Sequence, residues 1–139
     1  MTIDKIQQEI VEEFSMFDDW MQRYEYIIEL GKSLSIIDEK NQTEENLIKG
    51  CQSKVWLFAE KNAQQNVVYT ANSDAILTKG IIALLLRVFS NQKPKDILAA
   101  NLHFIDQIGL KEHLSPTRAN GLLSMIKQIK LYALAFQNK

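Results

Sequence analysis

The sequence predicts an α+β fold, in which a small antiparallel sheet packs against several helices. Two observations predict it. Apolar residues recur three and four positions apart through most of the chain, as on one face of a helix. Two short segments, 54–60 and 66–71, are instead rich in β-branched and aromatic residues. The 139 residues contain no internal repeat and no linker rich in Gly, Ser or Pro, so we expect one domain over residues 1–139.

The first forty residues predict two helices. Thr2 can cap the first helix. The second helix follows an N-cap at Asp18 or Asp19 and frays near residues 31–34. The polar segment 38–46 has nothing to bury and indicates a loop. The apolar stripe of the first helix consists of Ile3, Ile6, Ile10 and Phe14.

Residues 54–60 and 66–71 predict an antiparallel hairpin with a turn longer than the minimum. Two strands alone are marginally stable in water, so we expect a helix to cover one face and a third strand to extend the sheet. The strongly apolar segment 75–89 is suited to be the covering helix, with an N-cap supplied by residues 72–74.

The last third of the chain predicts short helices and then a long one. Pro94 suits the first turn of a short helix, since proline has no amide hydrogen to lose there. Residues 103–108 predict another short helix, which ends at Gly109. Ser115 caps and Pro116 opens the final helix.

Composition excludes several classes of function. The chain is 46% apolar and 24% charged, and its 16 basic and 17 acidic residues lie throughout the sequence, with a formal net charge of −1. Such a balance provides no broad cationic field, so nucleic acid is not an expected partner. The longest apolar run, residues 80–89, is too short to cross a bilayer, so no membrane association is expected.

The N-terminal residues and the cysteine count indicate a compartment. The first 14 residues include acidic side chains and no uninterrupted apolar stretch, so they do not resemble a signal peptide. One cysteine cannot close an intrachain disulfide. A cytoplasmic location is therefore the simplest expectation.

Neither a metal nor a bound cofactor is expected. His103 and His113 are ten positions apart on different predicted segments, without the spacing of a zinc site. The five glycines form no glycine-rich phosphate-binding loop.

Cys51 is the residue best suited to chemistry, although a lone cysteine is often a small buried hydrophobe. Gly50 gives the backbone freedom for a turn, and Gln52 is polar, so the thiol is expected on a loop before the first strand. Arg118 follows the Ser115 cap and would favour a thiolate if the chain folds it close to Cys51.

Four blocks of sequence resemble the SufE family, the sulfur acceptors of cysteine desulfurases. They contain GCQSKVW at residues 50–56, DWMQRYEYIIELGKSL at 19–34, NSDAILTKGIIALLL at 72–86 and GLKEHLSPTRANGLLSMI at 109–126. One departure is visible: family members commonly have Val-Pro before Gly-Cys, where this chain has Ile48 and Lys49. Without the proline, the approach to the loop should be less rigid.

The resemblance implies a SufE/IscU-like fold and a sulfur-relay mechanism. Cys51 would take the outer sulfur of a persulfide on a SufS-like desulfurase, stimulate that enzyme, and pass the sulfur to a SufB-like iron–sulfur scaffold. The pyridoxal phosphate would belong to the desulfurase, and this chain would be an accessory protein without turnover of its own. The residues implied to support Cys51 are Gly50, Gln52, Asp74, Arg118 and His113.

The residue pattern leaves alternatives open. The acceptor could be a different sulfur-using enzyme. The chain could itself be an iron–sulfur scaffold, although one cysteine is few for that purpose, or a cysteine hydrolase, which would need an oriented histidine beside Cys51. A monomer and a weak homodimer are equally compatible with the sequence.

Overall fold

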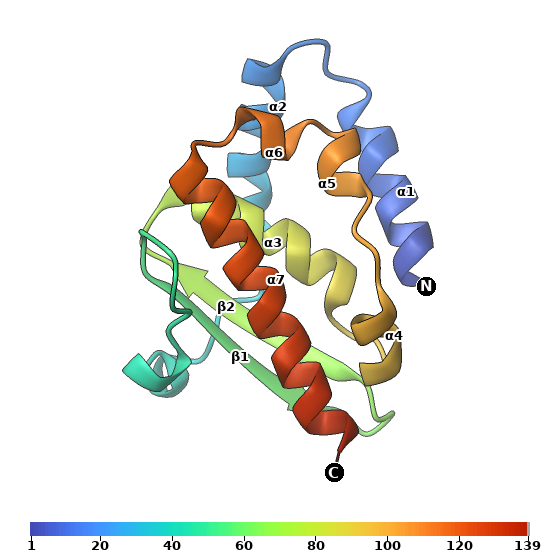
Figure 1. Cartoon of the computed structure of the whole chain (residues 1–139), viewed down its shortest axis with the longest axis vertical. Coiled ribbons are helices and arrows are strands. Elements are labelled where there is room, and N and C mark those ends of the chain that lie inside the picture. Colours follow the sequence, from blue (N-terminus) through green and yellow to red (C-terminus); the bar gives the residue numbers. More distant parts are fainter. Residues whose placement is uncertain (139) are drawn as a thin grey trace.

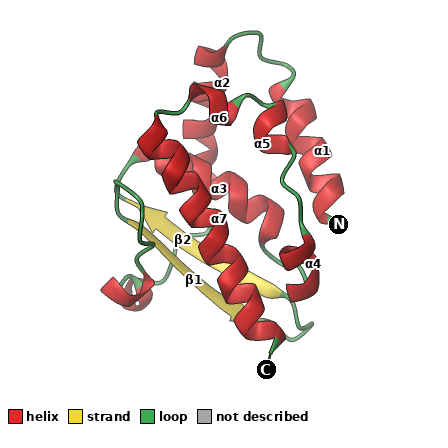
Figure 2. Cartoon of the chain, in the orientation of Figure 1, coloured by secondary structure: helices red, strands yellow, loops and turns green. Residues whose placement is uncertain are grey.

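A computed structural model describes residues 1–138 of the chain. Helices pack against one face of a two-stranded antiparallel sheet (Figures 1 and 2), which confirms the α+β prediction. In chain order the elements are α1 (Ile3–Phe14), α2 (Trp20–Leu30), β1 (Val55–Lys61), β2 (Val67–Ser73), α3 (Ile76–Phe89), α4 (Pro94–Ala99), α5 (Phe104–Gln107), α6 (Leu110–His113) and α7 (Pro116–Gln137), with short 3₁₀ turns at Gly31–Ser33, Glu39–Asn41 and Glu44–Asn46.

The sheet buries one face beneath two helices. Alternate side chains of each strand are buried, because successive residues of a strand point to opposite faces. Helix α3 packs on β2, and α7 crosses β1 (Figure 1). The buried strand residues are Val55, Leu57, Ala59, Val67, Tyr69, Ala71 and Ser73.

The third strand expected from the sequence does not form in the described residues. Single bridges replace it: Ile36 pairs with Ala71, and Leu47 pairs with Trp56. The 3₁₀ turns at Glu39–Asn41 and Glu44–Asn46 redirect the chain between these two bridges. The segment therefore touches both edges of the sheet without running along either one.

Helix α3 is the centre of the core. Ten of its residues are buried, as the apolar sequence predicts. Gly80 of α3 faces α2 and packs against the backbone of Ile27. Gly31, in the turn that follows α2, packs against the same glycine. A side chain at Gly80 would collide with the carbonyl of Ile27, so glycine is required for this close packing of the two helices.

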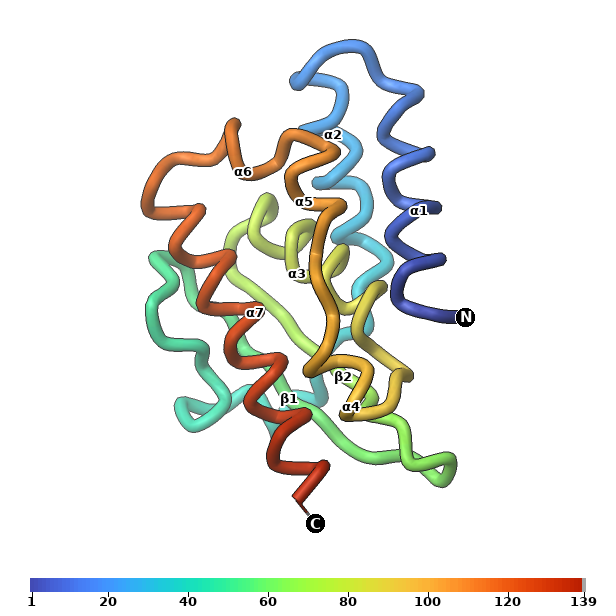
Figure 3. The backbone as a smooth tube through the Cα atoms, turned by 45° about the vertical axis from the view of Figure 1, so that its right-hand side comes forward, coloured from blue at the N-terminus to red at the C-terminus, as the bar shows by residue number. Residues whose placement is uncertain are grey.

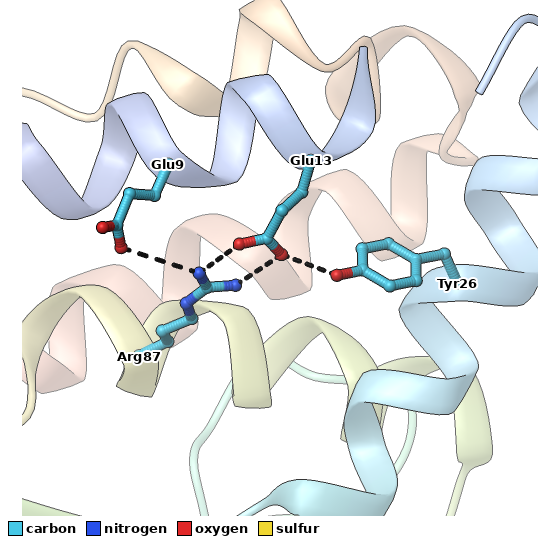
Figure 4. A network of polar contacts seen from close by, with 4 residues as sticks. All are labelled: Glu9, Glu13, Tyr26 and Arg87. Atoms are coloured by element: carbon cyan, nitrogen blue, oxygen red, sulfur yellow. Dashed lines mark hydrogen bonds and ion pairs between the residues drawn. The ribbon is translucent and has the colours of Figure 1, made fainter. Parts of the chain in front are cut away.

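An ion-pair network joins α1, α2 and α3 (Figure 4). Arg87 donates two hydrogen bonds to the carboxylate of Glu13, one of them at 2.8 Å, and lies 3.9 Å from Glu9. Tyr26 donates to the same carboxylate at 2.6 Å. The hydrogen bond from Arg87 lowers the pKa of Glu13, while burial and the neighbouring carboxylate raise the pKa of Tyr26.

No helix in residues 1–138 combines the length and apolar character needed to cross a membrane.

Candidate functional site

Cys51 lies on a short loop that enters β1. The amide of Ile48 donates to the carbonyl of Val55 at 2.8 Å, so the two ends of the loop are held together. Figures 1 and 3 both show this loop beside the first turns of α7. The reactive candidate therefore stands between a strand entry and a helix that begins sixty-five positions later in the chain.

Gly50 permits the turn that presents Cys51. Its φ angle is +95°, a value that residues with a side chain rarely adopt. A Cβ atom at this position would also lie 2.5 Å from the Oγ of Ser124 on α7. Conformation and space both require glycine here, in agreement with the turn expected from the sequence.

The thiol of Cys51 is half-buried against α7. Its Sγ donates a weak hydrogen bond to the carbonyl of Gly121 at 3.6 Å, and Gly121 has no side chain to block the approach. Burial raises the pKa of the Cys51 thiol. At rest the residue is therefore a neutral thiol at neutral pH, rather than the thiolate that a nearby arginine was expected to favour.

A cavity of about 20 Å³ lies beside the thiol. Its walls include Gln52, Thr78 from α3, and Arg118 and Met125 from α7. A volume of this size holds roughly one atom as large as a water oxygen. The site thus has room for a single additional atom attached to Cys51.

Arg118 reaches the cavity from the first turn of α7. Ser115 caps that helix by accepting from the amide of Arg118 at 3.3 Å, as the sequence predicts. The Nη1 atom of Arg118 is buried and has no hydrogen-bond partner within residues 1–138. A buried guanidinium nitrogen without a partner is costly, so an anionic group that reached this atom would be stabilised by it.

Asp74 anchors the loop but does not line the cavity. Its Oδ1 accepts from the amide of Lys54 at 3.0 Å, and its own amide donates to the carbonyl of Lys54 at 3.2 Å. The expectation that Asp74 caps α3 is wrong, because this carboxylate is turned toward the loop. The hydroxyl of Ser73 accepts from the amide of Ala75 instead, at 3.3 Å.

His113 does not line the cavity. Its ring stacks on Trp20 with centroids 4.3 Å apart and planes within 12°. Its Nδ1 is 2.8 Å from the carbonyl of Gly109. Helix α6 ends at His113, and these contacts hold the ring against α2 before the chain turns into α7.

The sequence analysis missed Thr78 and Met125 as walls of the cavity. Thr78 is 7% exposed and is a polar residue within the apolar run 75–89. A polar residue in an apolar run could have indicated a special position, because a buried hydroxyl needs a hydrogen-bond partner. Met125 carried no such signal, since its spacing is that of a core residue. The described residues contain no group of three or more His, Cys, Asp and Glu side chains suited to a metal ion.

Comparison with known proteins identifies the family. A family model described as "SufE: Fe-S metabolism associated domain" matches residues 8–133. The chain belongs to the SufE family. This confirms the resemblance inferred from the four sequence blocks, and it places the chain among proteins of iron–sulfur metabolism.

Individual SufE relatives cover nearly the same stretch. An uncharacterized SufE-like protein of Rhizobium meliloti (strain 1021) is 40% identical over 126 residues, which cover 88% of this chain and 90% of that protein. SufE-like protein 1, chloroplastic/mitochondrial, of Arabidopsis thaliana is 40% identical over 132 residues. That match covers 95% of this chain but 36% of the plant protein, so the SufE-like part is one portion of a longer chain there.

A solved structure shares the fold of this chain. The solution structure of a hypothetical protein from Thermus thermophilus matches with a TM-score of 0.80 over 100% of both chains, at 18% sequence identity. At that identity the likeness concerns the fold alone.

Proposed function

We propose that Cys51 accepts one sulfur atom from a persulfide on a partner cysteine desulfurase and passes it to an iron–sulfur cluster scaffold. The observation that carries this proposal is the small cavity beside the thiol, which is lined by Arg118, a residue whose buried Nη1 has no hydrogen-bond partner within residues 1–138. The chain acts as an accessory protein that stimulates the desulfurase, and the pyridoxal phosphate stays with that enzyme.

The transfer step balances without an oxidant. The thiolate of Cys51 attacks the terminal sulfur of the donor persulfide, and a new sulfur–sulfur bond forms as the old one breaks. The donor cysteine leaves as a thiolate, and Cys51 becomes a persulfide. A second exchange of the same kind transfers the terminal sulfur to the acceptor.

The burial of Cys51 supports a role in which the thiol and its persulfide are protected from side reactions. A buried neutral thiol reacts slowly with stray electrophiles, because the thiolate is the nucleophile. A persulfide is more acidic than a thiol, so its terminal sulfur is an anion that Arg118 can stabilise by a charge-assisted hydrogen bond. The cavity therefore stabilises a persulfide on Cys51 better than it stabilises the free thiol.

Access to Cys51 requires the loop to change position. The side chain is held to α7 by one weak contact at 3.6 Å, while the loop ends are firmly anchored at Val55 and Lys54. We propose that the loop alternates between this closed position and an open one on the partner. Hydrogen exchange on residues 47–54 should increase when a desulfurase is added, and equal protection in both samples would contradict this.

The direct test is sulfur loading. The protein is mixed with a SufS-type desulfurase and cysteine, and its intact mass is measured under non-reducing conditions. We expect an added mass of one sulfur atom that maps to Cys51 and is absent in Cys51→Ser. If the serine variant gains the same sulfur or stimulates the desulfurase equally, Cys51 is not the acceptor.

A conservative variant tests the role of Arg118. Arg118→Lys keeps the positive charge but loses the planar guanidinium, and Arg118→Gln loses the charge. We expect the persulfide on Cys51 to decay fastest in Arg118→Gln. If all three proteins keep their persulfide equally long, Arg118 has only a structural role.

A further inference from the structure

Thr78 of α3 is a buried polar residue with an unused hydroxyl. The buried polar residues within residues 1–138 are Gln7, Ser73 and Thr78. Gln7 donates to the carbonyl of Asn101 and accepts from the amide of Phe104. The hydroxyl of Ser73 donates to a backbone carbonyl at 2.9 Å. Thr78 differs from both, because its hydroxyl has no hydrogen-bond partner within residues 1–138. Burying a polar group without a partner is costly, so we expect a partner at another stage of function.

The position of Thr78 indicates where that partner would lie. Thr78 lines the cavity of about 20 Å³ beside Cys51. Arg118 lines the same cavity, and its buried Nη1 also has no hydrogen-bond partner within residues 1–138. Two side chains with unused hydrogen-bond donors therefore line a cavity that has room for one atom attached to the thiol.

The ends of two helices make this cavity favourable for an anion. Thr78 is the third residue of α3, and Arg118 is the third residue of α7, so both helices contribute their first turn. Figure 1 shows the starts of α3 and α7 beside the loop that enters β1. The first turn of a helix carries partial positive charge. At α3 no side chain caps this turn, since the N-cap residue is Ala75. An anion in the cavity would therefore be stabilised from both helices.

We propose that the hydroxyl of Thr78 donates a hydrogen bond to the terminal sulfur of a persulfide on Cys51 and, together with Arg118, holds that sulfur in the cavity. This inference rests on the proposed function and adds a binding residue from α3. The terminal sulfur of a deprotonated persulfide is an anionic acceptor, and hydrogen bonds to charged groups are about twice as strong as neutral ones. The hydroxyl thus acts on the loaded protein and has no such acceptor in the unloaded one.

Three variants test the role of this hydroxyl. Thr78→Val replaces it with a methyl group of similar size, and Thr78→Ser keeps it. Thr70→Val is the matched control, because Thr70 lies on the opposite face of β2 from the buried residues and lines a different pocket. Each protein is loaded with sulfur, and cyanide then removes the terminal sulfur as thiocyanate and leaves the Cys51 thiolate. Intact mass follows this loss, and urea unfolding checks that each variant is folded.

The persulfide of Thr78→Val should lose its sulfur about three- to tenfold faster than that of the parent, as expected for the loss of one hydrogen bond. Thr78→Ser and Thr70→Val should stay within about twofold of the parent. Alkylation of the unloaded thiol by iodoacetamide should be equally fast in Thr78→Val and the parent. Equal loss of sulfur from Thr78→Val and the parent would overturn the proposal. So would an equal acceleration of alkylation and sulfur loss, because the substitution would then merely loosen the Cys51 loop.

Two routes of loading separate this inference from the proposed function. One sample receives sulfur from a SufS-type desulfurase and cysteine. The other receives it from inorganic tetrasulfide: the Cys51 thiolate attacks a terminal sulfur, a sulfur–sulfur bond of the tetrasulfide breaks, and a shorter polysulfide leaves as an anion. A parent protein that is loaded by tetrasulfide but not by the desulfurase would contradict the proposed function, and the cyanide rates would still decide the role of Thr78.

Discussion

Cys51 combines two properties that oppose each other. Its burial raises the pKa of the thiol, which suppresses the reactive thiolate. It also lies on a loop that follows a glycine at φ +95°, and the proposed opening of this loop would expose the thiol to a partner. A residue that is inert in the closed position and reactive in an open one suits a carrier, because side reactions are suppressed between encounters.

Alkylation kinetics test the closed state. Because the folded pKa is raised, the rate of Cys51 alkylation by iodoacetamide should rise at a higher pH than the rate for a free cysteine. Denatured protein should follow the free-cysteine curve. A native profile that coincides with the denatured one would show that the thiol is not buried in solution.

Gly50→Ala tests the turn beside the thiol. The substitution puts a side chain at φ +95° and against the Oγ of Ser124, so the protein should lose about 1–3 kcal/mol of unfolding free energy. Adding Ser124→Ala removes the contact with the Oγ and should restore part of this loss. Chemical denaturation measures both values, and no recovery in the double variant would contradict the contact.

At the scale of elements, α3 and α7 together determine the site. Helix α3 brings Thr78 to the cavity, and α7 brings Arg118 and Gly121. The crossing of α2 over α3 holds α3 in place, because Gly80 lets its backbone approach Ile27 closely. The position of the cavity thus depends on helix packing some distance from Cys51.

Two glycine variants test separately the contact between α2 and α3 and the contact between α7 and Cys51. Gly80→Ala forces α2 away from α3 and should lower the unfolding free energy by about 1–3 kcal/mol. Gly121→Ala is also in a helix, but its new Cβ would lie 3.6 Å from the Sγ of Cys51, an ordinary contact. Helix propensity should then leave its stability unchanged or raise it by up to about 1 kcal/mol. Equal destabilisation in the two variants, by thermal or urea unfolding, would contradict this account.

At the scale of the whole molecule, the network of Arg87, Glu13 and Tyr26 joins three helices in a place distant from the thiol. The folded pKa of Glu13 lies below its ordinary value of 4.5. Its stabilising contribution is therefore present above the unfolded pKa and disappears as the pH falls through the folded one.

Acid unfolding tests this network. The free energy of unfolding should fall by about 1 kcal/mol through the loss of this network as the solution is acidified below the ordinary glutamate pKa. In Glu13→Gln that part of the pH dependence should be missing, and the protein should already be weaker at neutral pH. Urea titrations across the acid range measure the difference. Parallel curves for the two proteins would show that Glu13 does not titrate as described.

Residue spacing predicted most of the elements, and the single cysteine provided the candidate reactive residue. Apolar periodicity and capping residues depend on local geometry, so they indicated α1, α3 and α7, and the β-branched segments indicated the hairpin. The thiol was identifiable because it is the single cysteine and follows a glycine.

Tertiary packing decided the surroundings of that thiol. Arg118 and Gly121 lie about seventy positions from Cys51, so their contact with the cavity depends on where α7 crosses the loop. The same packing turned Asp74 toward Lys54 and placed His113 on Trp20. Burial raises the pKa of Cys51, and the sequence did not show this, because desolvation depends on all the elements that surround a group and spacing along the chain does not describe them.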